Sequence, residues 1–295
     1  MNAKDVKQIT VIGAGQMGHQ IGMLCALGGY ETIIQDLSET ALQDADAKLH
    51  MIMSKWVAKG KLAEDAKAAA FGRLRFSSSL QESVRSSDLI IEAVTEKLEV
   101  KKEVFRKLEE YAPPHAIFAT NSSTIVNSLI AGETERSEKV VNMHFFFPPL
   151  VMDCVEVVMS EQTSEETAQI AMEVCEKINR TAVLLKKEIS GFVANRILGA
   201  LQKEAVALYE QGIADYKDID VICRKALNHP IGPFELMDLS GLDVAYYVMD
   251  QRYRETGDPA DKPFDCVAEK VSKGELGRKT GKGWYEYSSS NKVKS

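Results

Sequence analysis

The sequence predicts an α/β fold, in which a doubly wound, mostly parallel sheet is followed by a smaller all-helical domain. Short apolar runs alternate with longer amphipathic ones over the first two-thirds of the 295 residues, a pattern typical of βαβ units. After Lys187 the strand signal stops and helical periodicity takes over. The length suits about two domains, so we expect one over residues 1–187 and another over residues 188–295.

The elements of the first domain follow from local pattern. Short apolar runs bounded by glycine, proline or polar residues predict strands at residues 8–13, 31–36, 88–94, 116–121, 140–146, 155–159 and 181–186. Longer amphipathic segments predict helices at residues 16–27, 38–59, 97–111 and 164–178.

The second domain is expected to consist of helices. Its first helix should end near Gly212, Pro233 can open a later helix, and Gly241 can close that one. The polar residues 288–295 are expected to fray. The apolar stripe of the first helix is Phe192, Ile197, Leu201, Ala205 and Leu208.

Composition excludes several classes of function. With 36 basic and 43 acidic residues the formal charge is −7, which argues against a nucleic-acid partner. No apolar run reaches the ~18 residues that cross a bilayer, so no membrane partner is expected. The five cysteines stand singly, which favours a reducing, cytoplasmic location and neither disulfides nor a metal site. They are Cys25, Cys154, Cys175, Cys223 and Cys266.

A glycine-rich turn directly after the first strand predicts a dinucleotide site in a sheet of the Rossmann type. Gly13, Gly15 and Gly18 fit G-x-G-x-x-G, the pattern that lets a pyrophosphate approach the backbone at a helix N-terminus. Asp36 ends the second strand, where a carboxylate can accept hydrogen bonds from ribose hydroxyls. The alternative is an unrelated glycine turn, with Asp36 as the N-cap of the next helix.

One histidine lies where an open α/β fold binds its ligands. His144 is near the end of an apolar strand, just before Pro148, and Glu156 is the one acid in the next apolar run. If the two strands lie side by side, Glu156 can orient the imidazole for proton transfer. The alternative is a core histidine and a surface-facing Glu156. Structural roles are expected for the other histidines, which are His19, His50, His115 and His229.

Several stretches in a fixed order resemble the 3-hydroxyacyl-CoA dehydrogenase family over almost the whole chain. They are Val11 to Gly18, Glu92 to Glu96, Thr120 to Ser123, His144 to Phe146 with Val155 to Val157, Gly191 to Arg196, His229 to Glu235, and Gly277 to Gly281. The resemblance implies hydride transfer between NAD and carbon 3 of a short 3-hydroxyacyl-CoA. It also implies a homodimer formed through the helical domain.

The resemblance also implies roles for single residues. His144 would be the general base, Glu156 its partner, and Ser123 and Asn195 would hydrogen-bond the reacting oxygens. Lys59 would approach the CoA phosphates. The positions that match cofactor contacts are Gly13, Gly15, Gln16, Met17, Gly18, Asp36, Ala93, Glu96, Lys101 and Lys279.

Four of these assignments have structural alternatives. Ser123 could be a helix N-cap and Asn195 an exposed polar residue of a helix. Lys59 could lie at a solvated helix end, and Lys101 could be one charge on an exposed face.

Two positions depart from the family pattern. Phe147 stands where the family has an asparagine that contacts the cofactor, and Ser190 stands where it usually has proline. Ser190 can serve as an N-cap, so the helix start is expected to survive. Two other functions therefore stay open: a related dehydrogenase of small hydroxy acids or carnitine-like alcohols, and a dinucleotide-binding protein with little turnover.

Overall fold

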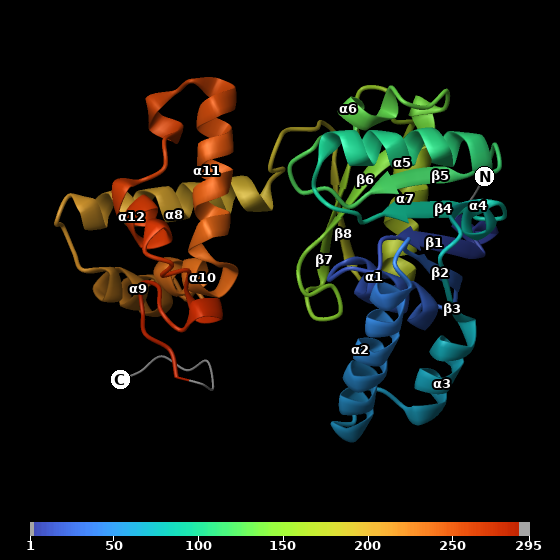
Figure 1. Ribbon diagram of the computed structural model, residues 1–295, viewed down its shortest axis with the longest axis horizontal. Coiled ribbons are helices and arrows are strands. Elements are labelled where there is room, and N and C mark those ends of the chain that lie inside the picture. Colours follow the sequence, from blue (N-terminus) through green and yellow to red (C-terminus); the bar gives the residue numbers. More distant parts are fainter. Residues whose placement is uncertain (1–2, 289–295) are drawn as a thin grey trace. The chain divides into compact units, whose positions relative to one another are not determined.

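The computed structural model describes residues 3–288, and the chain forms two compact units, Met1–Phe192 and Val193–Ser295 (Figure 1). The division falls a few residues after the 187/188 boundary expected from the sequence. Among residues 3–288, no helix is both long and apolar enough to cross a membrane.

An eight-stranded sheet organises the first unit, in the order β3-β2-β1-β4-β5-β6-β7-β8 (Figure 1). All neighbouring strands are parallel except β6 and β7, which run antiparallel. The predicted doubly wound, mostly parallel sheet is therefore confirmed. The strands are β1 Gln8–Ile12, β2 Glu31–Gln35, β3 Leu74–Ser77, β4 Leu89–Glu92, β5 Ile117–Thr120, β6 Val140–Phe145, β7 Cys154–Val158 and β8 Thr181–Leu185.

Helices cover both faces of this sheet and bury apolar side chains against it. One face carries α1 (Gly18–Leu27), α2 (Glu39–Ala58), α3 (Glu64–Arg73) and α7 (Glu165–Lys177). The other carries α4 (Leu80–Val84), α5 (Leu98–Tyr111) and α6 (Ser128–Ala131). Two short 3-10 turns, η1 (Ala3–Asp5) and η2 (Ser137–Lys139), complete the unit.

Capping serines fix two of the helix starts that the sequence predicted. Ser38 Oγ accepts a hydrogen bond from Ala41 N, and Ser164 Oγ accepts one from Thr167 N. The sequence analysis missed β3, α3, α4 and α6. In β3 only Leu74 is buried, so its apolar signal is weak.

The second unit is helical, as predicted. Pro233 opens one helix at its first position and Gly241 ends it, as expected. Residues 289–295 of the predicted tail lie outside the described part of the chain. The elements are α8 Ala194–Glu210, α9 Tyr216–Lys225, α10 Pro233–Ser240, α11 Leu242–Thr256, η3 Pro259–Asp261, α12 Asp265–Ser272 and η4 Arg278–Thr280.

Two expectations at the junction were wrong. Ser190 does not cap the first helix of the second unit, because α8 begins at Ala194 after Val193. Gly191 and Phe192 have φ values of 77° and 46°, a left-handed backbone that interrupts a right-handed helix. Phe192 therefore does not belong to the stripe of α8 and packs instead with Val158 and Leu185 of the first unit.

Two buried carboxylates hold the second unit together. Asp220 accepts hydrogen bonds from the Phe234 and Glu235 backbone N–H groups at the start of α10. Asp238 accepts them from Trp284 N and Tyr285 N. Burial raises the pKa of both Asp220 and Asp238. These backbone N–H groups, at the start of α10 and at Trp284 and Tyr285, thereby have acceptors within the second unit.

Candidate active site

The glycine turn after β1 has the geometry that the motif predicts. Gly13 has φ of 102°, and a Cβ there would lie 2.7 Å from Ala93 O; a Cβ on Gly18 would lie 1.7 Å from Gly13 O. Around a Cβ on Gly15 there is nothing within 4 Å. The first and third glycines are therefore needed to fold the turn, and the second leaves open space over its backbone.

Asp36 lies beside this turn. Its Oδ2 accepts a hydrogen bond from Ala14 N at 2.9 Å, and its Oδ1 accepts one from Ser38 N at 2.9 Å. The alternative role of Asp36 as a helix N-cap is wrong, because Ser38 caps α2. The carboxylate is half-buried at the end of β2, next to the open backbone of Gly15.

His19 stabilises the turn from the first turn of α1. Its Nδ1 contacts Gly15 O at 2.5 Å, and the side chain is buried. Burial lowers the pKa of His19, with the Lys48 ammonium adding to that effect and hydrogen bonds to Gly15 and Ala14 opposing it. The structural role expected for His19 is consistent with this packing.

His144 and Glu156 meet across the antiparallel pair β6 and β7. They are directly opposite in register, and His144 Nδ1 lies 2.8 Å from Glu156 Oε2. The two residues are 4% and 3% exposed, which rules out a surface-facing Glu156. Because an ionised carboxylate only accepts, Nδ1 donates, and the neutral imidazole carries its lone pair on Nε2.

Aromatic rings surround the imidazole. The Phe146 ring centroid lies 4.5 Å from that of His144, and the Phe192 centroid lies at 5.4 Å. The following residue, Phe147, is 58% exposed on the loop between β6 and β7. The imidazole therefore has two aromatic rings as neighbours, and an exposed third ring follows three residues later in the chain.

A chain of buried charges lies under the end of β4. Glu92 is fully buried, and both of its carboxylate oxygens accept from Lys101 Nζ, at 2.8 and 3.0 Å. Lys101 Nζ also pairs with Glu96 Oε2 at 3.2 Å. Lys101 is 1% exposed, so the alternative that placed it on an exposed helix face is wrong. On α5 it shares the inward stripe with Phe105 and Leu108.

Glu96 organises the turn formed by residues 122–124, which follows β5. Its Oε1 accepts from Ser122 Oγ, Ser123 N and both the N and Oγ1 of Thr124. Burial alone would raise the pKa of Glu96, but the Lys101 ammonium and these hydrogen bonds outweigh it and lower that pKa. Ser123 does not cap a helix, because Asn127 occupies the N-cap of α6.

The remaining candidate residues are on α2 and in the second unit. Lys59 is exposed at the C-cap of α2. Asn195 is half-buried in the first turn of α8, in the second unit. Lys279, also in the second unit, pairs with both oxygens of Asp243, at 2.5 and 2.6 Å.

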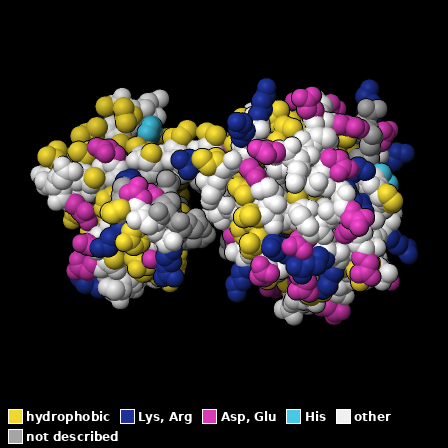
Figure 2. All heavy atoms as spheres, turned by 90° about the horizontal axis from the view of Figure 1, so that it is seen from above, with side chains coloured by type: hydrophobic (Ala, Val, Ile, Leu, Met, Phe, Trp, Pro, Cys, Tyr) yellow, Lys and Arg dark blue, Asp and Glu magenta, His cyan; other side chains and the backbone are white. Residues whose placement is uncertain are grey.

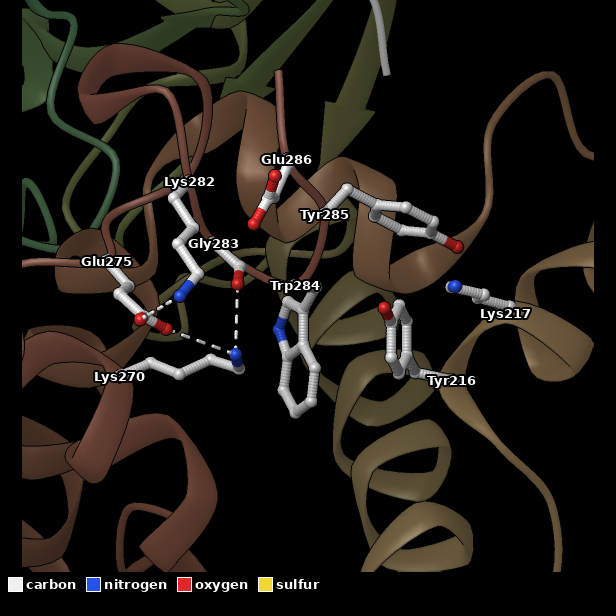
Figure 3. Close-up of a pocket in the computed structure, with 9 residues that line it drawn as sticks. All are labelled: Tyr216, Lys217, Lys270, Glu275, Lys282, Gly283, Trp284, Tyr285 and Glu286. Atoms are coloured by element: carbon white, nitrogen blue, oxygen red, sulfur yellow. Dashed lines mark hydrogen bonds and ion pairs between the residues drawn. The ribbon is translucent and has the colours of Figure 1, made fainter. Parts of the chain in front are cut away.

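Figure 3 shows a pocket in the second unit that contains none of the predicted site residues. Lys270 and Lys282 both pair with Glu275, at 3.5 and 2.6 Å, and Lys270 Nζ also lies 4.9 Å from the centroid of the Trp284 ring. Two of the pocket's three lysines are therefore held by one carboxylate, and the third, Lys217, lies 5.7 Å from the centroid of the Tyr216 ring.

Sequence reasoning missed the polar residues that support the site. Glu92 ends the apolar run of β4, the same signal that singled out Glu156. Asn121 Oδ1 accepts from Phe145 N, and Asn142 Nδ2 donates to Ser122 O. Thr120 Oγ1 donates to Glu92 Oε2. These contacts connect the 122–124 turn to the strand of His144.

Family models match both units of the chain. The model of the 3-hydroxyacyl-CoA dehydrogenase NAD binding domain matches residues 8–189, and the model of the C-terminal domain matches residues 191–287. The predicted resemblance is thereby confirmed over nearly the whole sequence.

Individual relatives agree with this match. A probable 3-hydroxybutyryl-CoA dehydrogenase of Bacillus subtilis is 36% identical over 96% of this chain and 98% of its own length. A 3-hydroxybutyryl-CoA dehydrogenase of Clostridioides difficile is 37% identical, over 95% of this chain and 99% of its own. The crystal structure of an (S)-3-hydroxybutyryl-CoA dehydrogenase from Ralstonia eutropha superposes with a TM-score of 0.91 at 34% identity, covering 96% and 100% of the two chains. The chain belongs to the 3-hydroxyacyl-CoA dehydrogenase family of NAD-dependent oxidoreductases.

Proposed function

We propose that this protein oxidises a short-chain 3-hydroxyacyl-CoA, with 3-hydroxybutyryl-CoA as the first candidate, and catalyses the reverse reduction. The observation that carries the proposal is the buried His144–Glu156 pair at the ligand-binding edge of an NAD-binding domain. The names of the similar proteins support the acyl-CoA substrate.

In this proposal His144 Nε2 accepts the proton of the 3-hydroxyl group. Glu156 holds the ring through Nδ1 and stabilises the imidazolium that forms, because its carboxylate accepts a buried hydrogen bond from Nδ1 at 2.8 Å. In the reverse direction the imidazolium returns the proton to the 3-oxo oxygen. Ser123 and Asn195 are assigned to hydrogen bonds with the substrate's oxygens.

The residues around the glycine turn fit a dinucleotide. The open space at Gly15 admits a pyrophosphate at the start of α1, and Asp36 can accept from ribose hydroxyls with its remaining lone pairs. Gln16, Met17 and Ala93 are assigned as backbone contacts, and Glu96 and Lys279 as side-chain contacts. Bound NAD supplies the hydride acceptor.

The test is steady-state oxidation of 3-hydroxybutyryl-CoA with NAD, compared with free 3-hydroxybutyrate and carnitine under the same conditions. We expect turnover with the thioester and none with free 3-hydroxybutyrate or carnitine. If Lys59 contacts the CoA phosphates, the KM for 3-hydroxybutyryl-CoA should be lower than the KM for its pantetheine analogue, which lacks them. Activity with the free acids only would favour a small-substrate dehydrogenase. Binding of NADH without any turnover would favour a non-catalytic protein.

The second unit supports the proposal of a homodimer. Figure 2 shows hydrophobic side chains spread over its surface, on the left of that view. Sedimentation of a Leu227→Glu variant should give a monomer where the wild type gives a dimer, and Val183→Glu in the first unit should not. The hydrophobic residues of the second unit that are at least half exposed are Ile197, Ile213, Ile222, Leu227, Leu239, Tyr247 and Val248.

We also propose a cytoplasmic location. The five cysteines are free, and Cys25 and Cys175 are completely buried. Burial raises the pKa of Cys25 to about 12, which keeps its thiol protonated and unreactive. Free thiols of this kind suit a reducing compartment.

A further inference from the structure

The family resemblance assigns Lys101 to the cofactor, but in this structure its ammonium group contacts carboxylates of the protein itself. An ammonium group has three N–H donors. Lys101 Nζ has three carboxylate oxygens within reach, which are Oε1 and Oε2 of Glu92 and Oε2 of Glu96. Because the side chain is 1% exposed and its donors are engaged, a ligand at the surface has no donor of Lys101 to use.

We propose that Glu92 and Lys101 are positioning residues, which act through Glu96 to hold the 122–124 turn and with it Ser123. This rests on the proposed function, because Ser123 is there assigned to bind the substrate. Neither residue touches the reacting atoms. Their task is to fix the carboxylate of Glu96, whose Oε1 in turn receives the donors of the turn.

Glu92 is itself fixed from two elements. Its Oε1 accepts from Val94 N at 2.7 Å, and its Oε2 accepts from Thr120 Oγ1 at 2.7 Å. Ser122 N in turn donates to Thr120 Oγ1 at 3.2 Å. The 122–124 turn is therefore held at Ser122 by way of Thr120 and, from Ser122 to Thr124, by way of Glu96. Both routes lead back to Glu92.

The same turn is tied to the strand of the proposed base. Asn142 Nδ2 donates to Ser122 O at 3.0 Å, and Asn121 Oδ1 accepts from Phe145 N at 2.9 Å. In the sheet, Glu92 is paired with Thr120 and Thr120 with Asn142, two residues before His144. A shift of the turn therefore changes the distance between Ser123 and the imidazole, a change to which proton transfer is sensitive.

A test of the positioning role must remove the charges of Glu92 and Lys101 together. Lys101→Met alone leaves the Glu92 carboxylate buried without its cation, which is strongly destabilising, whereas removing both charges of a buried pair is often tolerated. The variant is therefore Glu92→Gln/Lys101→Met. Lys102→Met is the matched control, because Lys102 is the next residue of α5 and pairs with Glu133 at the surface.

Hydrogen exchange followed by mass spectrometry on the protein without substrate is the first measurement. We expect the peptide containing residues 122–124 to exchange at least ten-fold faster in the double variant and unchanged in Lys102→Met. In a Glu96→Gln background the double change should add less acceleration than in the wild-type background, because only the route through Thr120 is left to lose. Unchanged exchange, or acceleration of the same size in both backgrounds, overturns the proposal.

NADH affinity and turnover give the second measurement. We expect kcat to fall at least ten-fold and to fall no further when Ser123→Ala is added. The Kd of NADH, from fluorescence, should rise no more than it does in Glu96→Gln, because Lys101 reaches the cofactor only through Glu96. A ten-fold weaker Kd with normal exchange overturns the proposal in favour of direct cofactor contact. Faster exchange with normal kcat also overturns it. If the wild type has no acyl-CoA activity, the proposed function fails, and exchange still decides whether the turn depends on Lys101.

If the double variant does not fold, Glu96→Gln replaces it. Glu96 is partly exposed, so this change leaves the Glu92–Lys101 pair intact in the interior. The same acceleration in the 122–124 peptide is expected, and normal exchange there overturns the proposal.

Discussion

His144 and Glu156 occupy facing positions of β6 and β7, with His144 Nδ1 2.8 Å from Glu156 Oε2. The contact is set by backbone register, because each residue is held in a strand that pairs on both sides. Removing either side chain should therefore leave the sheet in place. The pair can be tested as a catalytic unit with little risk to the fold.

The first prediction concerns this pair. His144→Asn and Glu156→Gln should each lower kcat, His144→Asn by about 10² to 10⁴ as expected for a general base. The Kd of NADH should stay within a few-fold. The double variant should be no slower than the worse single variant, because Glu156 acts through the imidazole. Multiplicative losses in kcat would give Glu156 a separate role.

The second prediction separates the two tasks of the glycine turn. Gly15→Ala should leave the free energy of unfolding within about 0.5 kcal/mol of wild type, since its Cβ meets nothing within 4 Å. It should weaken NADH binding at least ten-fold, because the methyl group occupies the space assigned to the pyrophosphate.

Gly18→Ala should act mainly on stability. It should lower the free energy of unfolding by about 2 kcal/mol or more, since its Cβ would lie 1.7 Å from Gly13 O. Gly132→Ala, which also has free space around its Cβ, is the control for both. Normal NADH affinity in Gly15→Ala would contradict the assignment of this turn to the cofactor.

The third prediction is a preference for NAD over NADP. The Asp36 carboxylate would face the 2′-phosphate of NADP, and charges ~4 Å apart repel by about 1–4 kcal/mol between bulk water and a protein surface. Asp36→Asn should raise the ratio of kcat/KM for NADPH to that for NADH by roughly ten-fold or more. The amide oxygen can still accept from Ala14 N, which keeps the glycine turn, while the hydrogen bond from Ser38 N is lost. A wild type that uses NADPH as well as NADH would refute the role of Asp36.

The fourth prediction follows from the lowered pKa of His19, caused mainly by burial. At a pH between the pKa of His19 in the native protein and the pKa of about 6.5 of an unfolded histidine, the unfolded chain binds a proton that the native protein does not. This contribution to stability is therefore complete above about pH 6.5 and is lost as the pH falls toward the lower native value.

Urea unfolding of wild type and His19→Gln at pH 8 and pH 5.5 measures this. The advantage of the wild type in unfolding free energy should shrink at pH 5.5, because glutamine can still donate to Gly15 O but does not titrate. His229→Gln serves as control, because His229 is half-buried in the turn between α9 and α10 and the structure gives its imidazole no ion pair among residues 3–288. An advantage that stays constant or grows in acid would contradict the prediction.

The sequence predicted the sheet and the dyad because their signals are local. The glycine spacing identifies the turn, and the prolines after His144 end one strand close to the start of the next. Asp36 was found because it directly follows the second strand. The family resemblance then assigned roles that spacing alone left open, such as those of Ser123 and Asn195.

The ion pairs that Lys101 forms with Glu92 and Glu96 were missed, although the positions of Lys101 and Glu92 in the sequence already indicate burial. Lys101 falls on the inward stripe of α5 with Phe105 and Leu108, and Glu92 ends a buried strand. A charge at such a position needs a partner. Which partner it has depends on strand order and on the loop between β4 and α5, and these are tertiary features that residue spacing does not contain.

The last prediction concerns Phe147, where the family pattern has asparagine. The ring is 58% exposed on the loop that follows His144, so a substrate chain can still cover it. Covering about 40 Å² of apolar surface contributes about 1 kcal/mol, which offsets one lost neutral hydrogen bond to the cofactor of roughly 0.5–1.5 kcal/mol. We therefore expect an active enzyme with an acyl site narrowed toward four-carbon substrates.

Phe147→Asn, assayed with 3-hydroxyacyl-CoA substrates of increasing chain length, tests this. The smaller side chain opens space and removes apolar contact, so kcat/KM should fall for the four-carbon substrate relative to longer ones, while the KM for NAD changes little. Leu129→Asn, an exposed position on α6, is the matched control and should leave the chain-length profile unchanged. A Phe147→Asn variant that binds NAD much more tightly and keeps the wild-type chain-length profile would contradict this prediction. It would show that position 147 contacts the cofactor, because a ring that shapes only the acyl site should change the chain-length preference and not the NAD affinity.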